Sequence, residues 1–98
     1  MIPSTSRERP KTLSIALDYD DTYTADRDLW NSFIAAAQGR GHEILVVSFR
    51  EEWQMEPVRK EFPHLRVFGT NCIPKRKYCD DHGIWIDIWI DDLPGTIV

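Results

Sequence analysis

Acidic side chains gather directly after two apolar segments of this 98-residue chain, residues 13–17 and 84–90. They are Asp18, Asp20 and Asp21 after the first segment, and Asp91 and Asp92 after the second. Either group alone is typical of turns and helix caps. If the two segments are neighbouring strands, however, the carboxylates converge, and two such charges ~4 Å apart repel by about 4 kcal/mol at an effective dielectric near 20. Such a site must take up protons or bind a cation, and oxygen ligands alone select a hard ion such as Mg²⁺.

Apolar segments alternate with helical patterns along the chain. The expected strands are residues 13–17, 44–47 and 65–68, and a strand within 84–90. The expected helices begin at Asp26 or Asp28, near Glu56 and at Pro74, and they end at Gly39, near Phe62 and at Gly83. This order predicts an α/β fold, a Rossmann-like three-layer sandwich with a mainly parallel sheet of about four strands. In such folds ligands bind beyond the carboxyl ends of the strands.

Polar residues also follow the second and third expected strands. Ser48 follows the second strand, and Lys75 and Lys77 follow the third. A hydroxyl and an ammonium group are donors that can bind an anion beside the acidic residues. Lys75 directly follows Pro74, which suits the first turn of a helix, so Lys75 is expected to face the site. A shifted helix boundary would exchange it for Lys77.

With these residues in place, the sequence resembles the haloacid dehalogenase (HAD) superfamily over most of its length, from about Leu13 to Pro94. The segment Leu17-Asp18-Tyr19-Asp20-Asp21-Thr22 is similar to the first motif of that family, DxDx[TV]. Ser48 resembles the second motif, a lysine at a helix start resembles the third, and Ile90-Asp91-Asp92 resembles the acidic fourth. The resemblance implies a HAD-like core and, most often, Mg²⁺-dependent phosphoryl transfer through an aspartyl-phosphate.

The resemblance gives each acidic residue a role. Asp18 is the expected nucleophile that attacks phosphorus, and splitting hydrolysis into two steps makes each step easier. Asp20 is the expected general acid and base, first for the leaving oxygen and then for the water. Asp91 and Asp92 are the expected Mg²⁺ ligands together with Asp18 and the backbone carbonyl of Asp20.

The remaining polar residues are expected to support this chemistry. Ser48 would donate a hydrogen bond to a phosphoryl oxygen, and Lys75 would balance the charge of the nucleophile and the transferring group. Thr22 is interpreted as a residue that orders the turn after Asp20. Arg50 is interpreted as a solvated loop arginine, with a phosphate contact as the alternative.

Three features depart from the family pattern or extend it. Family members commonly carry Gly where this chain has Asp21. The connections in which cap domains are inserted are short, so the chain is expected to have no cap domain and an open site. The last strand is expected to be a sheet edge, which self-association could cover, making a homo-oligomer the alternative to a monomer. Strict alternation along residues 84–90 would place the isoleucines on one face and Trp85, Asp87 and Trp89 on the other.

Composition predicts a single domain, residues 13–98, after a flexible N-terminal tail at residues 1–12. The chain has 12 Lys and Arg residues and 16 Asp and Glu residues, for a net charge of −4, which argues against sequence-independent nucleic-acid binding. Cys72 and Cys79 match no zinc spacing or disulfide framework. The N-terminus has no apolar signal-peptide core, and no apolar segment approaches the ~20 residues that cross a bilayer. These features predict a soluble cytoplasmic protein without a membrane partner.

The leading hypothesis is therefore a small, capless, Mg²⁺-dependent phosphatase that acts on a phosphorylated small molecule or macromolecular end. The alternative is a catalytically degenerate module of the same fold that binds a metal or phosphate. A response-regulator receiver would need its phosphorylated Asp after the third strand, where this chain has Gly69 and Thr70. A polynucleotide 3′-end phosphatase is a narrower form of the leading hypothesis, but the basic residues are too scattered to predict a groove.

Overall fold

The structure is a computed structural model that describes residues 11–98. The predicted tail, residues 1–12, therefore lies outside the described residues except for Lys11 and Thr12, which are exposed and belong to no helix or strand. In the part of the chain that the structure describes, no helix combines the length and the apolar character needed to cross a membrane.

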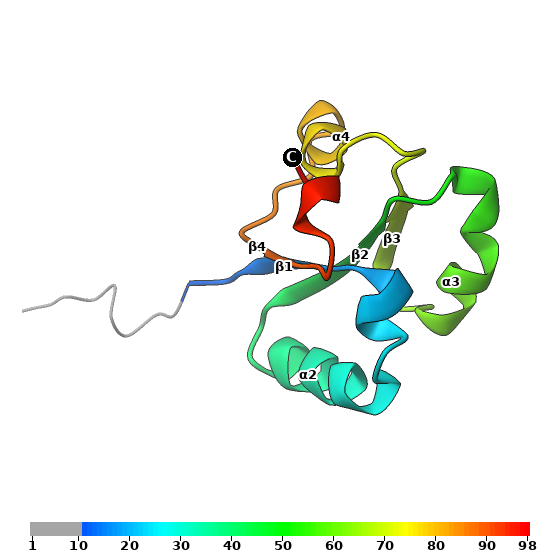
Figure 1. The fold of residues 1–98 in the computed structure, drawn as a ribbon. Helices are drawn as coiled ribbons and strands as arrows, with labels where there is room; N and C mark the ends of the chain where they lie inside the picture. Colours follow the sequence, from blue (N-terminus) through cyan, green and yellow to red (C-terminus); the bar gives the residue numbers. More distant parts are fainter. Residues whose placement is uncertain (1–10) are drawn as a thin grey trace, which may run out of the picture.

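Four parallel strands form one sheet (Figure 1). The strands are β1 (Ser14–Leu17), β2 (Glu43–Ser48), β3 (Arg66–Gly69) and β4 (Ile88–Ile90), in the order β3-β2-β1-β4 across the sheet. The apolar run 44–47 of β2 is fully buried, as expected for a parallel strand that is covered on both faces. The expected α/β fold with a four-stranded parallel sheet is confirmed.

Helices connect each strand to the next. They are α2 (Arg27–Gly39), α3 (Glu56–Glu61) and α4 (Lys75–Asp81), with short helical turns η1 (Tyr19–Tyr23), η2 (Glu52–Gln54) and η3 (Pro94–Thr96) beyond the ends of strands β1, β2 and β4. The Asp26 carboxylate accepts a hydrogen bond from the Leu29 N–H at 3.1 Å and caps the start of α2. The strand–helix order expected from the sequence is confirmed, with boundaries that shift by one or two residues.

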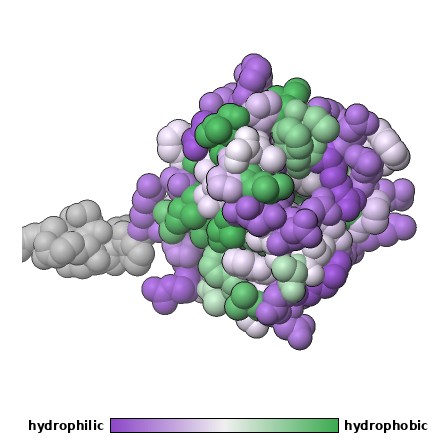
Figure 2. Space-filling view, in the orientation of Figure 1, coloured by the Kyte–Doolittle hydropathy of each residue, from purple (hydrophilic) through white to green (hydrophobic). Residues whose placement is uncertain are grey.

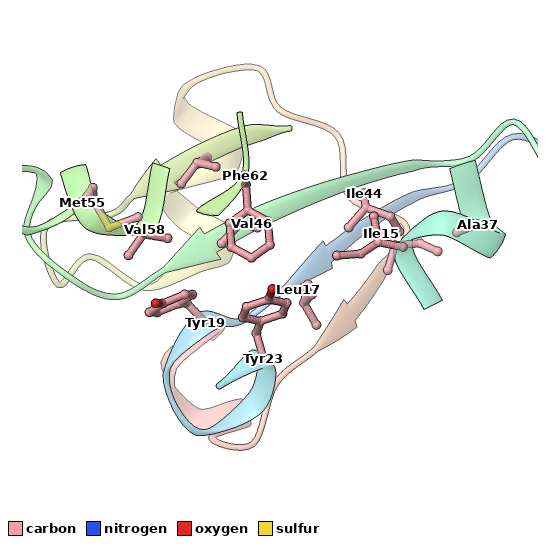
Figure 3. Close-up of a cluster of buried hydrophobic side chains, with 12 residues drawn as sticks. Ile15, Leu17, Tyr19, Tyr23, Ala37, Ile44, Val46, Met55, Val58 and Phe62 are labelled. Carbon is pink, nitrogen blue, oxygen red and sulfur yellow. The ribbon is translucent and has the colours of Figure 1, made fainter. Parts of the chain in front are cut away.

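The side chains of the sheet divide the core into two layers of packing. One set of strand residues faces α2 and α3 together with Tyr19, Tyr23 and Phe62; its members are Ile15, Leu17, Ile44, Val46 and Val67 (Figure 3). The opposite set faces α4 and includes Ala16, Leu45 and Val47, which pack with Cys79 and Ile84. Helices therefore cover both faces of the sheet, which gives the three layers of a Rossmann-like sandwich (Figure 1).

The path of the chain reverses once across the sheet. From β1 through β2 to β3 it moves toward one edge, with α2 and α3 on one face; it then returns through α4 on the other face to β4, beside β1. Because the direction and the face change together, the three crossovers have the same hand. The carboxyl ends of β1 and β4 lie side by side, and ligands of open α/β sheets bind at such a crevice.

The segment before β4 differs from the alternation expected for residues 84–90. Regular pairing begins only at Ile88, and Ile84 instead packs beneath α4, where its N–H donates to the carbonyl of Cys79 at 2.8 Å. Trp89 packs on the α4 side with Ile84 and Ile86, whereas Ile90 packs on the α2 side. The predicted division into an isoleucine face and a tryptophan face is therefore wrong, because residues 84–87 are not a strand.

The β4 strand is an edge of the sheet, as expected. An apolar groove of about 430 Å³ lies between α2 and the β1–β4 side of the sheet, and Phe33, Ile88 and Ile90 are among its lining residues. In Figure 2 hydrophobic residues gather on the side of the molecule near β4 and α4, whereas hydrophilic residues dominate the α3 side. Self-association at this edge stays a prediction.

Candidate functional site

The backbone brings the two acidic segments to one edge of the sheet. Asp18 directly follows β1 and Asp91 directly follows β4, and the Asp18 N–H donates to the carbonyl of Ile90 at 3.0 Å. Single oxygens of Asp18, Asp91 and Asp92 lie within 4.8 Å of one another. The convergence of carboxylates that the sequence predicts therefore occurs in the structure.

Lys75 is buried beside two of these carboxylates. It is the first residue of α4, only 1% exposed, and its Nζ donates to Oδ1 of Asp18 at 2.7 Å and to Oδ2 of Asp91. Lys77 points away into solvent and pairs with Asp81 at 2.9 Å. Of the two lysines that the sequence offered, the structure thus brings Lys75 to the acidic cluster.

The Thr22 hydroxyl joins the other side of the cluster. Its Oγ1 lies 3.1 Å from Oδ2 of Asp18 and 3.0 Å from Oδ1 of Asp92, and it accepts the N–H of Asp92 at 3.1 Å. A hydroxyl has one proton, so it can donate to only one of the two carboxylates at a time. Thr22 therefore orders the turn, as expected, and also holds two acidic side chains against each other.

Burial and charge favour a proton on Asp18. The pKa of Asp18 is raised from 3.8 to about 6: loss of solvent is the largest cause, Lys75 opposes it, and the carboxylates of Asp91 and Asp92 add to it. The pKa of Asp92 is lowered, because Asp18 and Thr22 provide hydrogen bonds to its carboxylate. The raised pKa of Asp18 thus reflects burial and crowded negative charge, which a bound cation would relieve.

The carboxylate oxygens of the cluster suit a divalent cation as ligands. Three ionised carboxylates and one ammonium group leave two negative charges in the cluster. Lys75 occupies Oδ1 of Asp18 and Oδ2 of Asp91, whereas Oδ2 of Asp18 faces Asp92 across a single hydroxyl. Carboxylate oxygens select a hard ion, and an ion that keeps several waters needs only a few protein ligands, which is the behaviour of Mg²⁺.

Asp20 is not part of this carboxylate cluster. Its Oδ2 accepts the Nε of Arg50 at 2.9 Å, and its Oδ1 accepts Nη2 of Arg50 at 2.8 Å. Arg50 therefore holds both oxygens of the residue that was expected to be the general acid and base. The interpretation of Arg50 as a merely solvated arginine is wrong, because it forms this two-point ion pair and lies over the Tyr19 ring, 5.3 Å from its centroid.

Asp21 occupies a backbone conformation that glycine adopts easily. Its φ is 64°, in the left-handed region, and its N–H donates to Oγ1 of Thr24 at 2.9 Å. Gly adopts this conformation most easily, and Asp is among the other residues that tolerate it. The departure at Asp21 therefore leaves the turn intact and adds one exposed carboxylate to the rim of the site.

Ser48 ends β2 and is 1% exposed. Its Oγ accepts the N–H of Arg50 at 3.2 Å, which uses an acceptor position and not the hydroxyl proton. Ser48 is not among the described residues that line the pocket at the acidic cluster. Its predicted hydrogen bond to a phosphoryl oxygen stays a prediction.

A pocket of about 130 Å³ opens over the cluster. Its lining combines the predicted residues with others that the sequence analysis missed: Phe49, Leu93 and Thr96. The chain after β4 folds back on α4, where the Arg76 N–H donates to the carbonyl of Ile97 at 2.9 Å, and this return brings Leu93 and Thr96 to the pocket. Only their nearness to Asp91 and Asp92 in the sequence could have indicated them.

In comparisons with known proteins, no protein-family model, curated protein or solved structure matches this chain. What the site can do is therefore derived from its own atoms. They provide a buried carboxylate with one oxygen held by an ammonium group, two further carboxylates beside it, and a small open pocket above.

Proposed function

We propose that this protein is a Mg²⁺-dependent phosphoric monoester hydrolase of the HAD type, which acts through an aspartyl-phosphate on Asp18. The observation that supports it most is the environment of the Asp18 carboxylate. Oδ1 is fixed by Lys75, and Oδ2 lies beside Asp92 at the point where the donor set fits a cation. A carboxylate held in this way has a defined direction for attack on a phosphorus atom in the pocket.

The proposed reaction has two steps, and each step forms one bond to phosphorus and breaks another. An oxygen of Asp18 forms a bond to phosphorus as the bond to the leaving oxygen breaks, and the leaving oxygen takes up a proton. Water then attacks the same phosphorus, the bond to Asp18 breaks, and inorganic phosphate leaves as the Asp18 carboxylate is regenerated.

Asp91, Asp92 and Asp18 would hold the cation through carboxylate oxygens, with the backbone carbonyl of Asp20 as the further ligand that the resemblance implies. Bound Mg²⁺ would neutralise the excess negative charge of the cluster and orient a phosphoryl group. Lys75 would keep Oδ1 of Asp18 in place and offset the negative charge of the transferring group. Ser48, at the end of β2, would donate its hydroxyl proton to a phosphoryl oxygen.

Asp20 would serve as the general acid and base only after its carboxylate leaves Arg50. In the ion pair, both oxygens of Asp20 are occupied by the guanidinium group. The pair is accessible to solvent, since the side chains of Arg50 and Asp20 are 31% and 49% exposed. A rotation of the Asp20 side chain toward the pocket therefore needs no change in the core.

A panel of phosphate monoesters, assayed with and without Mg²⁺, tests the proposal. We expect hydrolysis that requires the metal, and a loss of at least about a thousandfold in kcat when Asp18 becomes Asn. Asp28→Asn, an exposed substitution on α2, is the matched control and should retain full activity. Turnover that persists in a folded Asp18→Asn protein would exclude Asp18 as the nucleophile.

One observation favours the second candidate, a degenerate module that binds a cation or phosphate without turnover. The carboxylate expected to act as acid and base is engaged by Arg50 in the structure. Binding of Mg²⁺ by a protein that hydrolyses no member of the ester panel would establish this alternative.

A further inference from the structure

The ion pair of Arg50 and Asp20 connects the two central strands at the rim of the pocket. Asp20 follows the end of β1 by three residues, and Arg50 follows the end of β2 by two. The two strands pair in parallel register, so both loops emerge from the same edge of the sheet. The guanidinium group also donates through Nη1 to the carbonyl of Gln54 at 3.2 Å. Arg50 therefore has one fixed partner in its own loop and one carboxylate partner that lines the pocket.

The backbone around Arg50 is anchored on both sides. Its N–H donates to Oγ of Ser48, and its carbonyl accepts the N–H of Asn71 at 3.0 Å. The carbonyls of Ser48 and Phe49 accept the N–H groups of Thr70 and Cys72, respectively, which lie in the loop after β3. The main chain at Arg50 is thus held in place, whereas its side chain is about one-third exposed at the rim.

We propose that Arg50 is a phosphate-binding residue that pairs with Asp20 until a substrate enters. An entering phosphoryl dianion displaces the Asp20 carboxylate from Arg50, and Asp20 then becomes available to the leaving oxygen. This inference rests on the proposed function and adds to it the residue that makes the site selective for a doubly charged phosphoryl group. Arg50 acts on the chemistry in two ways, by binding the substrate and by controlling the position of Asp20.

The chemistry of the pair makes this exchange favourable. A solvent-exposed ion pair contributes little stability, because water screens it and two side chains lose freedom to form it. A phosphoryl dianion has more charge and more oxygens than a carboxylate, and the planar fork of Arg matches it with two parallel hydrogen bonds. A singly charged diester gains less from Arg50 and would leave Asp20 in the pair.

Within residues 11–98, the basic side chains at this pocket are Arg50 at the rim and Lys75 beneath it. Lys75 is already bound to two carboxylates beneath the pocket. The other charged residues that line the pocket are acidic, namely Asp18, Asp20, Asp21, Asp91 and Asp92. A cation at the rim would therefore add to the proposed Mg²⁺ and to Lys75 in binding an anion, and Arg50 is a guanidinium group that already contacts a residue of the lining.

The test measures the affinity of inorganic phosphate by calorimetry in saturating Mg²⁺, so that it does not depend on turnover. Arg50→Gln should weaken binding at least about tenfold, because it removes a charged two-point donor. Arg50→Lys keeps the charge but loses the planar two-point donor, so its phosphate affinity should be intermediate. If Arg50→Gln does not fold, the affinity of Arg50→Lys is compared with that of the native protein instead. Asp20→Asn should bind phosphate more tightly than the native protein, because Arg50 no longer has a competing carboxylate.

The matched control is Arg66→Gln. Arg66 forms the same two-point pair with Glu43, at 2.8 and 3.1 Å, but near the amino ends of β2 and β3. It should leave phosphate affinity within about twofold of the native value, since it lies at the opposite end of the sheet. With ester substrates, Arg50→Gln should raise KM and lower kcat, because binding and the position of Asp20 are both affected.

The outcomes separate this inference from the proposed function. Phosphate affinity that is unchanged in Arg50→Gln, affinity that is not increased in Asp20→Asn, or a native protein that binds no phosphate would each overturn the role of Arg50. Ester hydrolysis with an unchanged KM in Arg50→Gln would overturn it and leave the proposed function standing. Binding that depends on Arg50 in a protein that hydrolyses no ester would uphold the phosphate site and refute the hydrolase.

Discussion

The ammonium nitrogen of Lys75 lies 2.7 Å from Oδ1 of Asp18, although the two residues are 57 positions apart in the sequence. The same nitrogen contacts Asp91, so that one cation ties the start of α4 to the ends of β1 and β4. The Lys75 side chain is 2% exposed. A buried ammonium group is tolerated because it is paired with carboxylates, and the buried carboxylates in turn need the ammonium group to offset their charge.

We expect Lys75→Met to destabilise the protein by about 3 kcal/mol, because it leaves two buried carboxylates facing each other without a cation. Urea unfolding at pH 7 in the absence of divalent ions measures this loss. Lys77→Met is the control: it removes an exposed pair with Asp81 four residues away in α4 and should cost less than about 0.5 kcal/mol. Equal stability of the two variants would contradict the prediction.

The raised pKa of Asp18 predicts an unusual pH dependence of stability. The folded protein binds the Asp18 proton more tightly than the unfolded chain does, since the pKa is about 6 in the fold against 3.8. Between these values the unfolded state carries fewer protons, so the contribution of Asp18 to the free energy of unfolding falls as the pH rises, by about 3 kcal/mol in all.

Comparison of the native protein with Asp18→Asn at several pH values from 4 to 7 isolates this contribution. Groups with lowered pKa values, such as Glu52, Glu61 and Asp87, have the opposite effect, because they stabilise the fold less as the pH falls. These groups are common to both proteins. The stability of Asp18→Asn relative to the native protein should therefore increase from pH 4 through pH 6 and level off only near pH 7. A constant difference would show that Asp18 titrates normally.

A divalent cation should stabilise the fold, because it offsets the excess negative charge of the carboxylate cluster. At a Mg²⁺ concentration one hundred times its Kd, the gain is about 2.7 kcal/mol. Asp92→Asn should weaken Mg²⁺ binding at least about tenfold, as the loss of a metal-site group does. The control Asp81→Asn changes an exposed acidic residue outside the cluster and should leave the midpoint of the Mg²⁺ titration unchanged.

Much of the fold was predictable because the signals in the sequence are local. The apolar run 44–47 is long enough for a strand and lacks alternation, and it is buried on both faces. Gly41, with a φ of 88°, follows the end of α2 close to the predicted stop. Parallel strands place their carboxyl ends at one edge, so the convergence of Asp18 and Asp91 could be predicted on the condition that their strands are neighbours, as β1 and β4 are.

The contacts that the sequence did not reveal depend on the paths of loops. The pair of Arg50 and Asp20 requires two loops to meet across the sheet edge, and no spacing within either loop specifies it. The alternation expected along residues 84–90 was wrong for a similar reason. Asp87 exchanges hydrogen bonds with Ser14, whose N–H donates to the Asp87 carboxylate at 2.8 Å, and regular strand pairing begins at the next residue, Ile88.

Gly69 shows how the core controls the loop that carries Arg50. It is the last residue of β3, opposite Ser48, and a Cβ atom there would lie 2.5 Å from Cγ of Met55 and 3.1 Å from the carbonyl oxygen of Arg50. Met55 is completely buried, so it has little room to move. We expect Gly69→Ala to destabilise the protein by about 1–3 kcal/mol, as overpacking of a core does.

The same substitution should also weaken phosphate binding, because the carbonyl of Arg50 must shift and carries the side chain with it. Gly39→Ala is the control, since a Cβ atom at this last residue of α2 meets nothing within 4 Å. It should be neutral or stabilise the helix by up to about 1 kcal/mol and leave phosphate affinity unchanged. Urea unfolding and phosphate calorimetry on both variants check the two effects. A Gly69→Ala protein as stable as the native one would show that Met55 can yield. Unchanged phosphate affinity in that protein would show that the position of Arg50 does not depend on this contact.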